Sequence, residues 1–238
     1  VISRTETNDK IGYMDPHLFP QASILDPTYT FTVPKKQTAA GCADAINHIM
    51  EQYFCEESSL LADGMMEAAF KSLMVNGRKC IENPEDYTAR AEMMLDCTLA
   101  CNSIFSLGNS RSLWPCHGLE HALSAYYDIT HGEGLAIITP RWMKHILNDH
   151  TVDRLAKYGV NVFGLDAAQD RYDIANQAIQ ATYDFFASLG IPMHLREVGI
   201  DDSRIDEMAH HVAELEGLDE AWAPLQEDDI AAIFRASL

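Results

Sequence analysis

Three histidines stand close together in the stretch WPCHGLEHALSAYYDITHGEG, which runs from Trp114 to Gly134. His117 and His121 are four residues apart, so on a helix both side chains project from one face, about one turn apart. His131 stands at the turn expected after this helix, beside a glycine. Imidazole nitrogens at such spacing are typical ligands of a transition metal.

An acidic partner for these histidines lies earlier in the chain. Asp44 and His48 are also four residues apart, in the segment AAGCADAINHIMEQYF, whose apolar spacing predicts a helix. One carboxylate with two or three imidazoles suits Zn²⁺ or Fe²⁺, whereas Mg²⁺ and Ca²⁺ prefer oxygen ligands. Spacing alone nominates His117 with His121 as the ligand pair on the second helix and leaves His131 outside.

A second interpretation comes from the run HGLEH, which fits the H-x-x-E-H pattern of one class of zinc peptidase. There, His117 and His121 would bind zinc, Glu120 would be the general base and a distant carboxylate the third ligand. A five-residue pattern often arises by chance, and this one leaves the earlier Asp and His pair without a clear role unless Asp44 is that ligand. A structural zinc site is a third alternative, although three histidines and one aspartate lack the usual thiolates.

Composition restricts the classes of partner. The 238 residues carry 17 basic and 36 acidic side chains, a formal charge of −19 that disfavours nucleic acid and anionic membranes and favours small molecules or proteins. No apolar run approaches the ~20 residues of a membrane span, and the start has no signal-peptide pattern. The six cysteines lie in apolar, helix-like segments, so we expect reduced thiols and a cytoplasmic protein.

The elements that must position these residues are mostly helices. Apolar spacing and capping signals predict helices at 38–54, 60–83, 84–106, 114–127, 134–147, 152–162, 174–189, 203–215 and 228–237. Thr38 is expected to cap the first of them, and Pro84 to occupy the first turn of the third. Residues 1 to about 33 read as extended segments (VIS, KIGY, ASILDP and YTFTV) that cannot form a domain alone, and we expect the chain to be a fragment.

Three long strings resemble the iron-containing (group III) alcohol dehydrogenases, and most closely their butanol dehydrogenase branch. They are ASILDPTYTFTVPKKQTAAGCADAINHIMEQYF (22–54), CHGLEHALSAYYDITHGEGLAIITPRWMKH (116–145) and LGIPMHLREVGI (189–200). Together they extend over nearly the whole chain in the order of the family. The resemblance implies a metal-dependent, NADPH- or NADH-linked enzyme that interconverts primary alcohols and aldehydes.

The resemblance also implies a set of site residues that differs from the one favoured by spacing. It assigns the metal, Fe²⁺ or Zn²⁺, to Asp44, His48, His117 and His131. It places His121 near the metal and the nicotinamide as the residue that passes a proton, without coordinating. No cofactor-binding residue can be assigned from the sequence.

The family begins with an α/β nucleotide-binding domain that has glycine-rich phosphate loops, and this chain has no G-x-G-x-x-G. We therefore expect residues 1–33 to be remnant strands of that domain. Residues 34–238 would form the helical metal- and substrate-binding domain of the dehydroquinate synthase-like fold. A homodimer is expected from the same resemblance, and a glycerol-type polyol dehydrogenase is the related alternative.

Overall fold

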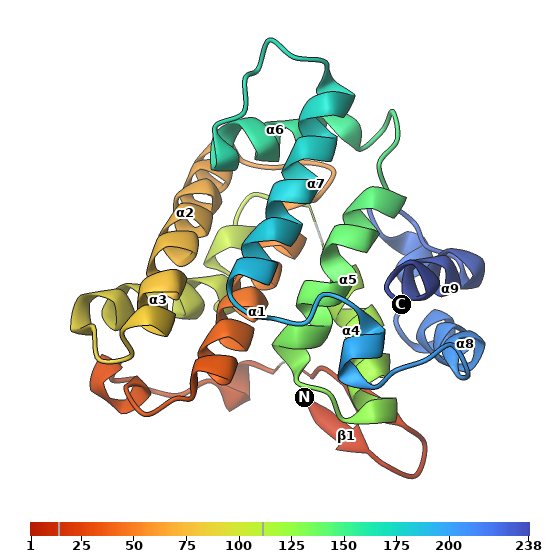
Figure 1. The fold of residues 1–238 in the computed structure, drawn as a ribbon, viewed down its shortest axis with the longest axis horizontal. Coiled ribbons are helices and arrows are strands. Elements are labelled where there is room, and N and C mark those ends of the chain that lie inside the picture. The colour runs from red at the N-terminus through yellow and green to blue at the C-terminus, as the bar shows by residue number, and fades with distance from the viewer. Residues whose placement is uncertain (14, 111) are drawn as a thin grey trace.

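The computed structural model describes residues 1–13, 15–110 and 112–238, and the described part is mainly helical (Figure 1). Its α-helices are α1 (Lys35–Tyr53), α2 (Leu60–Glu82), α3 (Tyr87–Cys101), α4 (Pro115–Tyr127), α5 (His131–His145), α6 (Val152–Phe163), α7 (Arg171–Ser188), α8 (Ile205–Leu215) and α9 (Glu227–Ala236). Its strands are β1 (Ile2–Arg4) and β2 (Asp9–Ile11). The predicted fold class, a helical chain with short strands at its start, is confirmed.

Helix α1 lies at the centre of the molecule and contacts α2, α3, α4 and α5 (Figure 1). Its small and aliphatic residues recur at helical spacing and are fully buried, among them Ala43, Ile46 and Met50. Small side chains let neighbouring helices approach this one closely. Residues that α1 carries on the face toward α4 and α5 are therefore held in a rigid setting.

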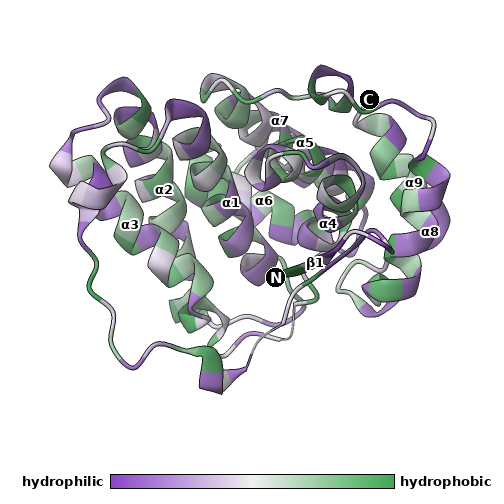
Figure 2. Cartoon of the chain, turned by 90° about the horizontal axis from the view of Figure 1, so that it is seen from below, coloured by the Kyte–Doolittle hydropathy of each residue, from purple (hydrophilic) through white to green (hydrophobic). Residues whose placement is uncertain are grey.

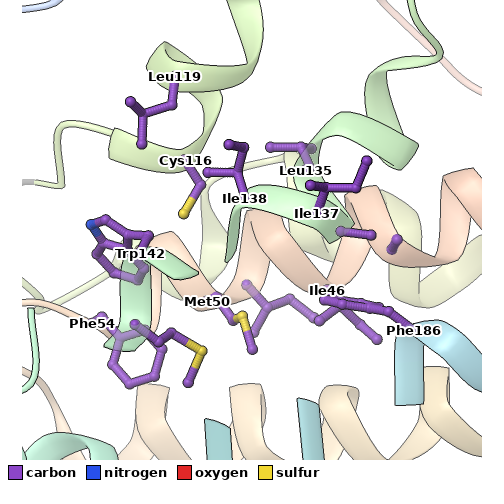
Figure 3. Close-up of a cluster of buried hydrophobic side chains, with 14 of the residues drawn as sticks. Ile46, Met50, Phe54, Cys116, Leu119, Leu135, Ile137, Ile138, Trp142 and Phe186 are labelled. Carbon is purple, nitrogen blue, oxygen red and sulfur yellow. The ribbon is translucent and has the colours of Figure 1, made fainter. Parts of the chain in front are cut away.

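The core lies where α1, α4, α5 and α7 meet. Figure 3 shows Ile46, Met50, Cys116, Ile138 and Phe186 pointing into this cluster. A buried hydrogen bond from the Thr139 hydroxyl to the Asn47 amide oxygen also joins α5 to α1. Apolar packing with a satisfied polar contact fixes the relative positions of the helices that carry the histidines.

An ion pair joins α2 to α6. The buried carboxylate of Asp63 accepts hydrogen bonds from Arg154, at 2.6 and 2.7 Å, and from Lys157 at 2.5 Å. Although burial by itself would raise it, these two cations hold the pKa of Asp63 at about 2. The pair therefore stabilises the folded chain at neutral pH.

The first residues form an antiparallel hairpin in which Ile2 lies opposite Ile11 and Ser3 opposite Lys10. Strand β2 lies against α4, below the main helical body in Figure 1. The prediction of extended structure is confirmed for these two strands. It is wrong for 27–30, where Asp26 accepts a hydrogen bond from Thr28 N and starts a short 3-10 turn; residues 22–26 and 31–33 form no strand either.

Several predicted helix boundaries need correction; α3 ends at Cys101 rather than at 106, and α7 begins at Arg171 rather than at 174. Helix α1 begins at Lys35 after Pro34, so Thr38 lies inside it and its hydroxyl accepts a hydrogen bond from Arg90. Helix α3 begins at Tyr87, so Pro84 precedes it. Helix α5 begins at His131 rather than Gly134, which places that histidine on a rigid element instead of a loop.

Hydrophobic and hydrophilic residues alternate around the helices, as Figure 2 shows for α2, α3, α8 and α9. The described helices pack as amphipathic elements around a shared interior. Among them, none combines the length and apolarity that crossing a bilayer requires. All six cysteines are free thiols; Cys97 is partly buried, Cys101 is exposed and the other four are buried.

Candidate metal centre

Three of the histidines singled out by the sequence converge on one carboxylate oxygen of Asp44. The Nε2 atoms of His48, His117 and His131 each lie 3.5 Å from Oδ1 of Asp44. Asp44 and His48 project from α1, His117 from the first turn of α4 and His131 from the first residue of α5. Potential ligand atoms from three helices thus gather around Asp44 Oδ1.

The distances from the three Nε2 atoms to Asp44 Oδ1 suit ligands of one metal ion. Ligand atoms about 2.1 Å from a tetrahedral ion lie about 3.4 Å apart, close to the three separations measured here. Asp44 Oδ1 and His117 Nε2 are also buried and have no hydrogen-bond partner within residues 1–13, 15–110 and 112–238. Buried polar atoms are almost always paired, so a cation is a fitting partner for these two atoms.

The ligand atoms of these four side chains are not all equally close to one another. Asp44, His48 and His117 offer ligand atoms that all lie within 4.8 Å of one another. His131 is outside that set and joins it through its contact with Asp44, while its ring centroid lies 5.1 Å from that of His117. A cation at this point would draw the His131 ring toward the other three.

A buried carboxylate holds the far side of the His117 ring. The Nδ1 atom of His117 is hydrogen-bonded to Oε2 of Glu51, whose side chain is fully buried on α1. The other oxygen of Glu51 accepts hydrogen bonds from the backbone N–H of Cys116 at 2.5 Å and of His117 at 3.2 Å. Since Nδ1 is occupied, Nε2 is the nitrogen left to face Asp44.

His131 has the same kind of support. Its Nδ1 atom is hydrogen-bonded to Oε2 of Glu120, which is also fully buried. Lys10 from β2 approaches this pair, with Nζ 3.2 Å from the Glu120 carboxylate and 3.3 Å from His131 Nδ1. Two carboxylate-imidazole pairs therefore aim Nε2 of two histidines at one point, the arrangement that orients metal-ligating histidines in proteins.

Burial and neighbouring charges together shift the pKa values of the residues in the cluster. Burial favours the neutral form of Asp44, but His117, His48 and His131 outweigh it and hold the pKa of this carboxyl below its ordinary value. Burial would also lower the pKa of His117, but Glu51 and Asp44 raise it to about 10. The pKa of His48 is lowered, because burial outweighs the attraction of Asp44. The site as a whole favours positive charge at its centre.

Two glycines allow α5 to reach this position. A Cβ atom at Gly132 would lie 2.0 Å from the backbone oxygen of Ala40, so only glycine lets the start of α5 lie against α1. A Cβ at Gly134 would lie 2.7 Å from Cγ of Glu120. The run HGEG is thus needed for close packing of backbone and carboxylate, and both glycines are helical rather than part of a phosphate loop.

His121 lies beside the four converging side chains and outside the set that Asp44 gathers. Its ring stacks on that of His131, with centroids 5.8 Å apart, and meets His117 edge-on at 6.3 Å. Its Nδ1 atom lies 3.6 Å from Oε1 of Glu216, at the end of α8. Spacing along the chain favoured His121 over His131, whereas the fold brings His131 to Asp44.

A cleft of about 590 Å³ opens beside the cluster. Its walls include His48, His117 and His121 together with apolar residues such as Leu113, Trp114 and Leu215. The volume lies in the range of small-molecule sites, which are mostly apolar with a few polar groups at the reacting end. The candidate metal site therefore borders a space for an organic ligand.

The residues that sequence reasoning missed are the two supporting carboxylates and Lys10. Glu51 follows His48 by three residues on α1, and that spacing was a usable signal for a carboxylate near a ligand helix. Glu120 was considered only as the general base of the peptidase alternative, but it is fully buried and engaged by His131. A general base must be able to approach substrate or water, so this placement argues against the peptidase interpretation.

Comparison with known proteins assigns the chain to a family. Residues 38–238 match the profile of the Fe-containing alcohol dehydrogenase family, C-terminal. The chain is 48% identical to NADH-dependent butanol dehydrogenase A of Clostridium acetobutylicum over 239 residues, which cover 100% of this chain and 61% of the relative. It is 35% identical to the NADPH-dependent aldehyde reductase YqhD of Escherichia coli, over 86% of this chain and 52% of that protein.

Solved structures agree with the sequence comparison. NADH-dependent butanol dehydrogenase A from Thermotoga maritima superposes with a TM-score of 0.92 at 32% identity, covering 99% of this chain and 61% of that one. The substrate- and cofactor-free form of YqhD gives a TM-score of 0.90 at 30% identity, over 100% and 62%. The chain spans about three fifths of the length of these relatives. It belongs to the iron-containing alcohol dehydrogenase family.

Proposed function

We propose that this chain is the metal- and substrate-binding part of an NAD(P)H-linked alcohol dehydrogenase or aldehyde reductase acting on primary alcohols and aldehydes. Asp44, His48, His117 and His131 are its metal ligands, and His121 is its proton-transfer residue. The supporting relatives are named as butanol dehydrogenases that use NADH and an aldehyde reductase that uses NADPH. The metal is Fe²⁺ or Zn²⁺, since one carboxylate and three imidazoles suit either ion.

One observation carries the proposal. Three Nε2 atoms lie at the same 3.5 Å from Asp44 Oδ1, and two of those rings are held from behind by buried carboxylates. Carboxylate and imidazole ligands without thiolates, beside an open cleft, favour a catalytic metal over a structural one, whose sites are closed and commonly contain thiolates.

When bound, the metal supplies a positive charge for a carbonyl or alkoxide oxygen, and the nicotinamide supplies or accepts hydride. The residues of this chain do the remaining work. The carboxylate of Asp44 offsets the charge of the centre, and Glu51 and Glu120 keep the ligand rings oriented. His121 faces the same cleft and exchanges a proton with the oxygen of the substrate.

The cleft favours a neutral, alkyl-bearing substrate. Ile11, Tyr13, Leu113, Trp114 and Leu215 line it with apolar surface. Glu216 adds a carboxylate near His121, and its negative charge disfavours substrates that are themselves negatively charged. A short aliphatic aldehyde such as butanal matches both properties.

We further propose that residues 1–33 belong to an α/β nucleotide-binding domain and residues 34–238 to the metal- and substrate-binding domain. The family profile that matches describes a C-terminal part, and about two fifths of butanol dehydrogenase A and about half of YqhD lie outside the region matched here. Cofactor contacts would come from that region and from residues that border the cleft. A homodimer and a cytoplasmic location remain predictions.

The test uses the full polypeptide that carries this chain, loaded with Fe²⁺ or Zn²⁺. Oxidation of NADH or NADPH is followed at increasing butanal, with and without prior removal of the metal by a chelator. We expect saturable oxidation that is lost on chelation and restored by one of the two ions. The His121→Ala variant should keep its metal and lose about 100-fold in kcat, whereas His210→Ala, at an exposed position on α8, should change neither.

Two kinds of result would contradict the proposed function. Cofactor oxidation that does not depend on metal, or none with any primary aldehyde, would remove the proposal. Peptide hydrolysis that disappears in Glu120→Gln while His131→Ala retains both metal and activity would support the peptidase interpretation instead.

A further inference from the structure

His121 has one buried ring nitrogen for which the described residues offer no hydrogen bond. Its Nδ1 atom is inaccessible to solvent, and the closest carboxylate oxygen recorded is Oε1 of Glu216 at 3.6 Å. The two side chains are mostly buried, with exposed fractions of 12% and 27%. A small rotation of the carboxylate would close this gap to the roughly 2.9 Å of a hydrogen bond.

The position of Glu216 is determined by the packing of α8 on α4. Glu216 is the C-cap residue that follows α8, and its side chain lies directly over Gly118, one turn before His121. A Cβ atom at Gly118 would lie 3.1 Å from Cγ and 3.3 Å from Cδ of Glu216. The absence of a side chain at Gly118 therefore gives the carboxylate its place beside the imidazole.

Two other charged groups near this contact lie closer to other carboxylates, although His211 Nε2, like His121 Nδ1, makes no hydrogen bond among the described residues. Lys10 and His211 border the same small cavity as Glu216 and His121. The Lys10 ammonium pairs with Glu120 at 3.2 Å, and His211 Nε2 lies 3.3 Å from Asp9. This leaves the Glu216 carboxylate and the Nδ1 atom of His121 for each other.

We propose that Glu216 is a positioning residue that fixes the tautomer of His121. In this arrangement Nδ1 carries the hydrogen and donates it to Glu216, and Nε2 is left unprotonated toward the cleft. The inference rests on the proposed function, in which His121 exchanges the substrate proton. It adds a third carboxylate-imidazole pair to the two that orient His117 and His131.

The proton balance follows from this tautomer. In alcohol oxidation the substrate O–H bond breaks, the Nε2–H bond forms and the electron pair stays on the oxygen, while hydride leaves the carbon for the oxidised nicotinamide. Glu216 stabilises the imidazolium that results. In aldehyde reduction the same proton returns from Nε2 to the oxygen. With the opposite tautomer Nε2 would already carry hydrogen and could not accept the proton.

The test compares two variants of similar size in the full, zinc-loaded polypeptide. Glu216→Met removes the acceptor oxygen, and Glu216→Gln keeps an oxygen that can accept the Nδ1 hydrogen. Nitrogen chemical shifts of ¹⁵N-labelled histidine identify the tautomer of His121, assigned by loss of its signals in His121→Ala. We expect a protonated Nδ1 in the wild type and in Glu216→Gln, and a protonated Nε2 in Glu216→Met.

Kinetics with butanal and NADH give the second readout. We expect Glu216→Met to lose at least about tenfold in kcat with KM and zinc content unchanged, and Glu216→Gln to recover most of that loss. The proposal is overturned if the methionine variant keeps both the wild-type tautomer and kcat, or if its activity falls only in step with lost zinc. A wild type that binds zinc and shows the expected tautomer but reduces no aldehyde would instead remove the proposed function.

Discussion

The Nδ1 atom of His117 is hydrogen-bonded to the carboxylate of Glu51, and this contact ties α4 to α1 at the candidate metal site. The same carboxylate binds two backbone N–H groups at the start of α4. Its position therefore sets both the direction of the imidazole and the place where the helix begins. The Glu120 carboxylate makes the same kind of contact with the His131 ring at the start of α5.

The first prediction concerns this carboxylate. Glu51→Gln keeps the size of the side chain but removes the charge that raises the basicity of His117, so metal affinity should fall about 10- to 100-fold. Competition with a chromophoric chelator measures the change. Glu214→Gln, at an exposed position on α8, is the matched control and should bind metal as the wild type does. Equal affinity in both variants would mean that Glu51 only caps the helix.

A second prediction separates the two roles considered for Glu120. If Glu120 supports His131, the Glu120→Gln variant should bind less metal, and Lys10 should lose its carboxylate partner. If Glu120 is instead a peptidase base, the same variant should keep its full metal occupancy and lose only peptide hydrolysis. Elemental analysis of Glu120→Gln after gel filtration distinguishes them, and full occupancy would contradict the supporting role.

The third prediction tests the close approach of α5 to α1. Gly132→Ala places a methyl group 2.0 Å from the backbone oxygen of Ala40, so the start of α5 must move and His131 with it. We expect a loss of about 1–3 kcal/mol in unfolding free energy and a marked loss of bound metal. In Gly64→Ala, within α2, the new methyl group meets open space, and stability should stay equal or rise slightly. Unchanged metal content in Gly132→Ala would contradict the account.

A fourth prediction follows from the low pKa of Asp63. A carboxyl whose folded pKa is about 2, below its ordinary 3.8, stabilises the fold above about pH 4, and that contribution is lost as pH falls toward 2. Asp63→Asn should therefore cost about 3 kcal/mol at pH 7, and the difference from wild type should shrink in acid. Urea unfolding at several pH values measures it. Asp149→Asn, at an exposed surface pair, should cost little at any pH.

Much of the helical architecture was predictable because the apolar residues of these segments recur with helical spacing. Helix α2 was predicted at 60–83 and observed at Leu60–Glu82, and α6 at 152–162 against Val152–Phe163. The extended reading failed at 22–33, where an Asp-Pro pair starts a 3-10 turn with local hydrogen bonds. Residues with strand propensity form a sheet only where neighbouring strands can pair with them.

The candidate site was only half predictable for a different reason. Spacing shows which residues share a helix face, so it joined His117 to His121. The contact of His131 with Asp44 depends on how α5 lies against α1, which in turn depends on the packing of Gly132 against Ala40. Resemblance to the family pointed to His131, whereas no local pattern in the sequence did.

The most direct test of the proposed coordination is anomalous diffraction from crystals of the full polypeptide, recorded on both sides of the iron and zinc absorption edges. The account predicts one peak bound by a carboxylate oxygen of Asp44 and by Nε2 of His48, His117 and His131, with His121 facing the cleft. A fully occupied metal that is bound by His121, or that leaves the His131 ring turned away, would contradict it.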